Sequence, residues 1–350
     1  MTFHTGLVIG KFAPLHRGHQ FLLDRASAQC ERLVILSWSV PELPGCEPER
    51  REQWLQALYP GTQIVVLDNQ RLADWCARER LAVVALPRNE DEAEVHRRFV
   101  GWLLRELMHT GVDAVFTSEA YGDGLASALT AMQGGARPVV HEEIDRGRTR
   151  YPISGTRVRA DVHASRHTLD PLVYADFVER IAVLGGESTG KTTLSAALAQ
   201  ELDTAWVPEY GRELWQARSG KLVFADMLEI ARTQVEREDE AARHARRYLV
   251  CDTTPLTTLL YSQFMFDRAD PQLELLAERS YRRTLFCAGD FEFVQDGTRQ
   301  PVDFQRRQQA WYVHEFSRRN ICALRMTGSL GDRIHAAMRG LNSAPGQACP

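Results

Sequence analysis

The stretch Arg180–Thr193, RIAVLGGESTGKTT, decides the fold of the half of the chain that it opens. Residues 181–184 are apolar and predict a buried strand, and the glycine-rich residues after them match the phosphate-loop pattern G-x-x-x-x-G-K-[ST]. Leucines at helical spacing then predict a helix that begins at the loop. Because this strand-loop-helix order is the context that the motif requires, we expect the loop to bind a nucleoside triphosphate.

The individual residues of this loop have distinct physical roles. Glycines let the backbone N–H groups close around an anion without a Cβ clash. Lys191 is expected to reach the β- and γ-phosphates of ATP, the co-substrate, and the Thr192 hydroxyl to bind Mg²⁺, the cofactor. The ATP-binding residues predicted in this segment are Gly185, Gly186, Glu187, Ser188, Thr189, Gly190, Thr192 and Thr193.

A second apolar strand, predicted at residues 248–251, ends at Asp252. An apolar strand that delivers a carboxylate beside the phosphate loop is typical of the strand that holds Mg²⁺ in this class of enzyme. The same carboxylate is also suited to take the proton from the attacked hydroxyl. The sequence leaves both roles of Asp252 open.

The segment AWVPEYGRE predicts a short strand that ends in a turn carrying Glu209, Tyr210 and Arg212. Such a turn suits nucleoside binding at the carboxyl edge of a sheet, although Glu209 would equally serve as a helix cap. Arginine-rich lids cover the phosphates in small-molecule kinases, and Arg299 is the first candidate for that role, ahead of Arg306 and Arg307. The strongly charged helix predicted at 225–247 is expected to be a solvated face without chemistry.

Since the phosphate loop lies at mid-chain, another domain must fill the residues up to about 170. Residues 7–12 predict a strand, and the segment GKFAPLHRGH carries His16 and His19 across a predicted helix start, on one side of it. This pair fits a metal site, two surface histidines, or a polyphosphate site completed by the helix N-terminus, Lys11 and Gly18.

The segment GKFAPLHRGH resembles the G-x-F-x-P-x-H-x-G-H signature of the nucleotidylyltransferase superfamily, and ISGTRVR, residues 153–159, resembles its second signature, I-S-x-T-x-x-R. In that family these segments hold the phosphates of ATP during adenylyl transfer. The resemblance implies catalytic roles for His16 and His19. It implies ATP binding by Gly10, Lys11, Phe12, Gly18, Ser154, Thr156 and Arg159.

Strands and helices are predicted to alternate between the two signatures, as a doubly wound sheet requires. The stretch VFTSEAYG resembles the corresponding segment of nicotinamide-mononucleotide (NMN) adenylyltransferases that are fused to a kinase. This implies substrate contacts from Glu119 and Tyr121. Arg50 and Arg51, on a predicted helix, are expected on a solvated face, with substrate contacts as the alternative.

In order along the chain, GGESTGKTT, PEYGRE, DTTPLTT and DGTR resemble the ribosylnicotinamide kinase half of the bifunctional, NadR-type family that joins this kinase to NMN adenylyltransferase. The resemblance implies an α/β protein with two doubly wound parallel-sheet domains. These are a Rossmann-like nucleotidylyltransferase over 1–168 and a P-loop kinase over 172–341, followed by a disordered tail at 342–350. The helix-turn-helix domain of some members is not expected.

The activity implied by this resemblance is NAD salvage by a bifunctional transferase. The kinase domain would phosphorylate nicotinamide riboside to NMN with MgATP, and the other domain would join NMN to the adenylyl group of ATP, giving NAD and pyrophosphate. Two alternatives stay open: a fusion that acts on a different nucleoside or phosphomonoester, and an N-terminal domain that only senses NAD or ATP.

Composition narrows the class of protein further. The net charge of −4 and the lack of a basic stripe argue against a nucleic-acid partner. No apolar run is long enough to span a bilayer, and the first residues do not form a signal peptide. Seven scattered cysteines without a C-x-x-C pair indicate reduced thiols. We therefore expect a cytoplasmic enzyme, with its oligomeric state, including a homo-oligomer, left open.

Overall fold

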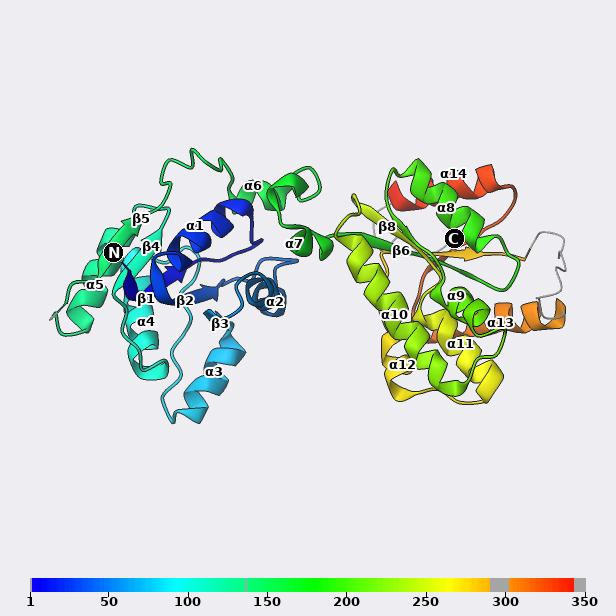
Figure 1. Ribbon diagram of the computed structural model, residues 1–350, viewed down its shortest axis with the longest axis horizontal. Coiled ribbons are helices and arrows are strands. Elements are labelled where there is room, and N and C mark those ends of the chain that lie inside the picture. Colours follow the sequence, from blue (N-terminus) through cyan, green and yellow to red (C-terminus); the bar gives the residue numbers. More distant parts are fainter. Residues whose placement is uncertain (1, 136, 290–301, 343–350) are drawn as a thin grey trace. The chain divides into compact units, whose positions relative to one another are not determined.

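The computed structural model describes residues 2–135, 137–289 and 302–342. The chain divides into two compact units, Met1–Tyr174 and Ala175–Pro350. Each unit has its own five-stranded sheet with helices packed against it (Figure 1).

All strands of the first sheet are parallel and pair in the order β3-β2-β1-β4-β5. They are β1 (Phe3–Ile9), β2 (Cys30–Trp38), β3 (Gln63–Leu67), β4 (Ala114–Thr117) and β5 (Val140–Glu143). The strand order reverses between β1 and β4. In doubly wound sheets, ligands bind at the carboxyl ends of the strands beside such a reversal.

The helices of the first unit are α1 (Arg17–Ser27), α2 (Pro48–Leu58), α3 (Asn69–Arg78), α4 (Ala93–Trp102) with a π-helical turn at Leu103–Leu107, α5 (Gly122–Met132), α6 (Gly155–Ala160), a 3-10 turn at Arg166–Thr168, and α7 (Pro171–Ala175). One face of the sheet, which carries Leu7, Val34 and Val115, packs against α3, α4 and α5. The parallel strands are buried on both faces, as crossover connections require.

The strands of the second sheet are β6 (Glu179–Gly185), β7 (Trp206–Val207), β8 (Tyr248–Asp252), β9 (Arg283–Cys287) and β10 (Ala323–Met326). They are parallel and pair in the order β10-β9-β6-β8-β7. Its helices are α8 (Lys191–Glu201), α9 (Tyr210–Ala217), α10 (Phe224–Ala242), α11 (Pro255–Phe266), α12 (Pro271–Leu276), α13 (Val302–Arg318) and α14 (Leu330–Asn342).

Alternate residues of β6 face opposite layers of helices. Ile181 and Val183 pack in one cluster with α8 and α14. Ala182 and Leu184 pack in another, with α9 to α13. This arrangement sets the phosphate loop at the end of the central strand, beside the end of β8.

The predicted fold class, two doubly wound parallel sheets with a Rossmann-like and a P-loop topology, is therefore confirmed. Details differ. The first strand ends at Ile9 and not at Phe12, whose φ of 47° leaves the extended region. Glu238 lies on the helix expected to be a solvated face, yet its carboxylate is fully buried against Arg279 and Tyr281. Among the described residues five cysteines are free thiols, but Cys322 is disulfide-bonded, so the expectation of reduced thiols is wrong for that residue.

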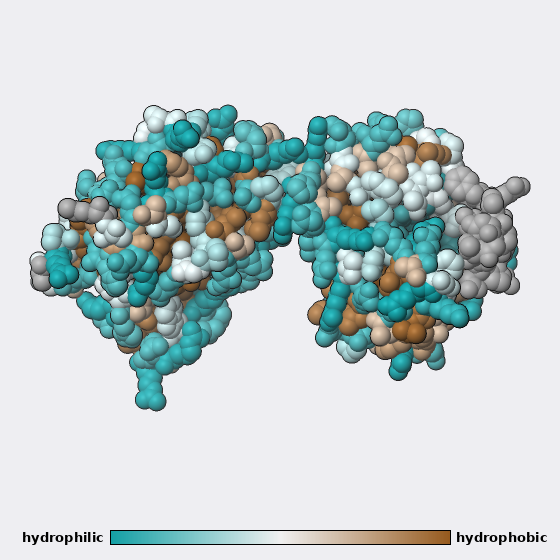
Figure 2. Space-filling model, in the orientation of Figure 1, coloured by the Kyte–Doolittle hydropathy of each residue, from teal (hydrophilic) through white to brown (hydrophobic). Residues whose placement is uncertain are grey.

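Most of the face shown in Figure 2 is hydrophilic, with hydrophobic side chains in scattered patches. Among the described residues, none of the helices is long and apolar enough to cross a membrane.

Candidate active sites

A cavity of about 620 Å³ lies in the first unit, where its lining includes Ile9 at the end of β1 and Thr117 at the end of β4. It brings together every residue of this unit for which the sequence predicts a site role. These are Gly10, Lys11, Phe12, His16, Gly18, His19, Glu119, Tyr121, Ser154, Thr156 and Arg159.

His16 and His19 form one stacked pair in the wall of this cavity. Their ring centroids are 3.7 Å apart, and His16 Nδ1, at the N-cap of α1, accepts a hydrogen bond of 3.3 Å from the backbone N–H of His19. Burial, followed by the charge of Arg148, lowers the pKa of His16 to about 4. Burial also lowers the pKa of His19 well below its usual value. Both imidazoles are therefore neutral at pH 7, and Nε2 of His16 carries its proton.

The described residues offer no support for the metal alternative at this pair. Nowhere in these ranges do three or more His, Cys, Asp or Glu side chains form a group that could hold a metal ion. The cations Lys11 and Arg159 line the same cavity as the two histidines, which matches the polyphosphate interpretation better, because N–H donors and positive charges are what an anion needs.

The second signature, residues 153–159, is hydrogen-bonded directly to the loop that carries the first. Ser154 caps α6 by accepting a hydrogen bond of 3.3 Å from the backbone N–H of Arg157. Arg159 donates to the backbone oxygen of Ala13 and, at 3.1 Å, to Thr156 Oγ1. Burial, followed by the Arg159 charge, lowers the pKa of the Lys11 ammonium. Two cations thus share one wall of the cavity.

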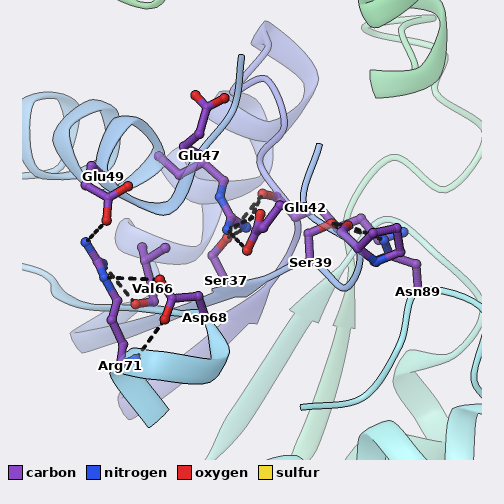
Figure 3. Close-up of polar contacts among 12 residues, drawn as sticks. Ser37, Ser39, Glu42, Glu47, Glu49, Val66, Asp68, Arg71 and Asn89 are labelled. Atoms are coloured by element: carbon purple, nitrogen blue, oxygen red, sulfur yellow. Dashed lines mark hydrogen bonds and ion pairs between the residues drawn. The ribbon is translucent and has the colours of Figure 1, made fainter. Parts of the chain in front are cut away.

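Several residues that line this cavity were not predicted from the sequence. Trp38 stacks on His96 with ring centroids 5.9 Å apart. Arg148 donates to Ile153 O at 3.3 Å and to Glu119 Oε1 at 3.2 Å. Asn89 donates to Ser39 Oγ and to Pro41 O, each at 3.1 Å (Figure 3). Asp91 and Arg97 complete this set. Asn89 and Asp91 precede α4 in a stretch without periodicity, and the pattern of α4 itself did not show that His96 and Arg97 line the cavity.

Arg51 is not where the sequence indicated. Its side chain is 0% exposed, so it lies neither on a solvated face nor in the cavity lining. Arg50, the residue beside it, is partly exposed and pairs with Glu47 at 3.6 Å. The helix therefore presents only one of the two arginines to solvent.

In the second unit the backbone of the phosphate loop adopts the left-handed conformation at two residues, a serine and a glycine. Ser188 and Gly190 have φ of 60° and 80°, in the left-handed region, and α8 begins at Lys191. The Lys191 ammonium donates to Gly186 O at 2.9 Å and is almost fully buried. The loop thus places a cation and a helix N-terminus around one small volume, as an anion site requires.

Asp252 meets Thr192 at the mouth of this loop. The Thr192 hydroxyl donates to Asp252 Oδ2 at 2.6 Å, and burial raises the pKa of this carboxyl. Asp252 Oδ1 is buried without a hydrogen-bond partner among the described residues. A buried carboxylate oxygen of this kind, beside a hydroxyl, fits an oxygen-ligated cation such as Mg²⁺.

Two glutamines of helix α13 form hydrogen bonds with the backbone of the phosphate loop. Gln308 Oε1 accepts a hydrogen bond of 2.8 Å from the Glu187 backbone N–H, and Gln305 Nε2 donates to Glu187 O at 2.7 Å. The Tyr261 hydroxyl donates to Glu187 Oε1 at 3.0 Å. The predicted loop residue Glu187 therefore has a positioning contact that the sequence did not indicate, because α13 was not foreseen.

The turn after β7 places Glu209 at the N-cap position of α9, but its side chain makes no capping hydrogen bond. Its Oε2 lies 3.3 Å from Nη2 of Arg212. Its charge contributes to the raised pKa of Asp252, after burial. The Tyr210 hydroxyl donates to Glu229 Oε1 at 3.3 Å. Arg299 lies outside the described residues, and so does the predicted tail 342–350, apart from Asn342, which is the last residue of α14.

Comparison with known proteins agrees with this architecture. A family model described as an AAA domain matches residues 180–333. The trifunctional NAD biosynthesis/regulator protein NadR of Escherichia coli (strain K12) is 28% identical over 310 residues, which are 84% of this chain and 71% of the relative. The protein of the same name from Salmonella typhimurium is 27% identical over 308 residues, with the same shares.

Two solved structures share the fold over both units. A NadR protein in complex with NR has a TM-score of 0.69 at 17% identity, and the match covers 100% of this chain and 98% of that one. A NadR protein in complex with NAD and AMP-PNP has a TM-score of 0.68 at 15% identity, covering 99% and 98%. The resemblance inferred from the motifs is confirmed: this chain is similar in sequence to two NadR proteins over 84% of its length, and it shares the fold of the two solved NadR structures.

Proposed function

We propose that this protein is an enzyme of NAD biosynthesis with two active sites. The second unit phosphorylates the 5′-hydroxyl of nicotinamide riboside with MgATP, and the first transfers the adenylyl group of ATP to NMN, giving NAD and pyrophosphate. The observation that carries the proposal is the cavity of the first unit, whose lining includes His16, His19 and Arg159, from two distant signatures. The names of the NadR relatives and the ligands of the two solved NadR structures support it.

In the first unit the nucleophile is a phosphate oxygen of NMN, so no side chain has to form a covalent intermediate. The new bond joins that oxygen to the α-phosphorus, and the bond to pyrophosphate breaks. Lys11 and Arg159 neutralise the triphosphate, while His16 and His19 supply N–H donors to oxygens on which charge develops. Burial lowers the pKa of both rings, so the proposal gives them the role of neutral hydrogen-bond donors to this charge.

In the second unit the amide N–H groups of residues 188–192 and Lys191 hold the β- and γ-phosphates. Thr192 and Asp252 would hold Mg²⁺, which neutralises charge between these phosphates. Glu209 lies close enough to influence Asp252 and is suited to orient the hydroxyl of the riboside. Arg299 stays the predicted source of further positive charge at the transferred phosphoryl group.

The test is product analysis of the full chain with nicotinamide riboside and excess MgATP, followed by the same analysis of a fragment of residues 1–174. The full chain should form NMN and then NAD. The fragment, which corresponds to one compact unit, should form NAD from NMN but not from the riboside. A folded fragment without adenylyl transfer would contradict the assignment of the first unit. A panel of other nucleosides and phosphomonoesters tests the acceptor.

A further inference from the structure

Arg51 is a buried cation that the proposed chemistry does not use. Its side chain, on α2, is 0% exposed. A guanidinium removed from water is costly unless it is paired and hydrogen-bonded. Arg51 is paired through Nη2, which donates to Glu42 Oε1 and Oε2 at 3.0 and 2.9 Å, while its Nε has no hydrogen-bond partner among the described residues.

The other terminal nitrogen of Arg51, Nη1, contacts the backbone at Lys11, in the loop that carries the first signature. Its Nη1 donates to Ser37 Oγ at 3.1 Å and to the backbone oxygen of Lys11 at 3.3 Å. The Ser37 hydroxyl donates to the same oxygen at 3.1 Å. The backbone of Lys11 is therefore held by two donors, while its side chain lines the cavity that Arg51 does not touch.

The loop needs such support because it leaves the strand in an unfavourable conformation. Phe12, the next residue, has a φ of 47°, where a bulky side chain is strained. Fixing the oxygen of Lys11 fixes the peptide plane between Lys11 and Phe12. That plane in turn sets where the Lys11 ammonium enters the cavity. Arg51 and Glu42 together carry no net charge, so their influence on this loop is geometric.

We propose that the Arg51–Glu42 pair, through Ser37, is a positioning element that fixes Lys11 for the triphosphate of ATP. The inference rests on the proposed adenylyl transfer. A lysine cannot replace Arg51 in this role. Its single ammonium cannot donate to Glu42 and to the backbone of Lys11 at the same time with the geometry of a planar guanidinium. Loss of this geometry should impair the use of ATP and spare the use of NMN.

A neighbouring arginine supplies a matched control. Arg71, on α3, donates to Glu52 Oε2 at 2.9 Å, to Glu49 Oε1 at 3.0 Å and to Val66 O at 3.1 Å. Figure 3 shows this second cluster beside the contacts of Ser37 and Glu42. Arg71 thus makes the same kinds of bond as Arg51, but none of them goes to the loop or to a cavity residue.

The experiment measures NAD formation by the full chain with ATP and NMN varied separately, for wild type, Arg51→Lys, Ser37→Ala and Arg71→Lys. Riboside phosphorylation by the same samples reports on the second unit and on protein quality. We expect Arg51→Lys to lower kcat/KM for ATP by roughly 10- to 100-fold, through a higher KM for ATP, and to leave kcat/KM for NMN at saturating ATP unchanged. Ser37→Ala should change kcat/KM for ATP in the same direction by less, and Arg71→Lys should match wild type.

Other outcomes overturn the inference. If Arg51→Lys behaves like Arg71→Lys, or loses efficiency equally for both substrates, Arg51 is merely structural. If Arg51→Lys does not fold, Ser37→Ala decides, because it removes one hydroxyl without a charge; unchanged ATP kinetics in that variant rejects the idea. If wild type itself forms no NAD from NMN, the proposed function fails and this inference fails with it.

Discussion

The hydroxyl of Thr192 donates a hydrogen bond of 2.6 Å to Asp252 Oδ2. The two residues are far apart in the sequence, but β6 and β8 are neighbours in the sheet, with Val183 in register with Asp252. The loop after one strand and the last residue of the other therefore meet at one edge. This contact joins the two predicted Mg²⁺ ligands.

Asp252→Asn should abolish most riboside phosphorylation and leave adenylyl transfer from supplied NMN unchanged. The amide keeps the shape of the side chain but removes the charge that a cation needs. If Asp252 is a metal ligand, high Mg²⁺ should restore part of the rate, because the site is weakened and not erased. If it is the base, Mg²⁺ should restore nothing. Steady-state kinase rates over a range of Mg²⁺ concentrations measure this, and near-wild-type turnover would contradict both roles.

His19→Ala should lower NAD formation from NMN and ATP by roughly 10²–10³-fold, the usual effect of removing one transition-state donor. Riboside phosphorylation should not change, since we assign it to the other unit. His4→Ala is the control, because His4 is exposed and contacts only Glu31 among the residues described. Equal loss of both activities in His19→Ala would instead indicate a folding defect.

His16 should make the first unit less stable in acid. Its folded pKa is about 4 against an ordinary value of 6.5. As the pH falls from about 6.5 to 4, His16 is therefore protonated in the unfolded chain but stays neutral in the folded chain. The stability present above pH 6.5 is lost through this window, by roughly 3 kcal/mol over its full width.

The measurement is hydrogen exchange of the β1 amides at pH 7 and pH 4.5, in wild type and in His16→Asn. Asparagine does not titrate and remains a good N-cap for α1. The free energy of opening should therefore fall less on acidification in the variant than in wild type. The same loss in both proteins would show that other groups cause the acid dependence.

Gly185→Ala should disrupt the phosphate loop. Gly185 has a φ of 149°, and a Cβ there would lie 2.7 Å from Cys287 O and 2.8 Å from Thr189 Oγ1. Gly61→Ala is the matched control, since Gly61 has a φ of 87° and nothing within 4 Å of an added Cβ. Backbone strain alone should cost the control about 1–2 kcal/mol. Gly185→Ala should cost more and lose riboside phosphorylation, as thermal unfolding and kinase assays would show. Equal stability losses with full kinase activity would contradict the clash.

Local patterns were sufficient for much of this molecule. The phosphate loop, the two nucleotidylyltransferase signatures and the apolar strand that ends at Asp252 are contiguous stretches whose geometry follows from their own residues. The order of strands and helices along the chain then indicated parallel sheets, because consecutive parallel strands need crossovers. These features were identifiable without knowing what packs against them.

The rest depended on tertiary contacts. Arg51 and Glu238 look like solvated charges in sequence, yet both are buried, because whether a helix face meets water depends on the elements packed over it. Asn89 lines the cavity from a stretch without periodicity, and His96 and Arg97 line it from α4, whose pattern does not show what the helix packs against. By itself the sequence predicted which residues bear chemistry, and it determined the strand-loop-helix segment that holds the phosphate loop. Only the tertiary structure determined which distant side chains are in contact and which charged groups are buried, since both depend on packing between residues far apart in sequence.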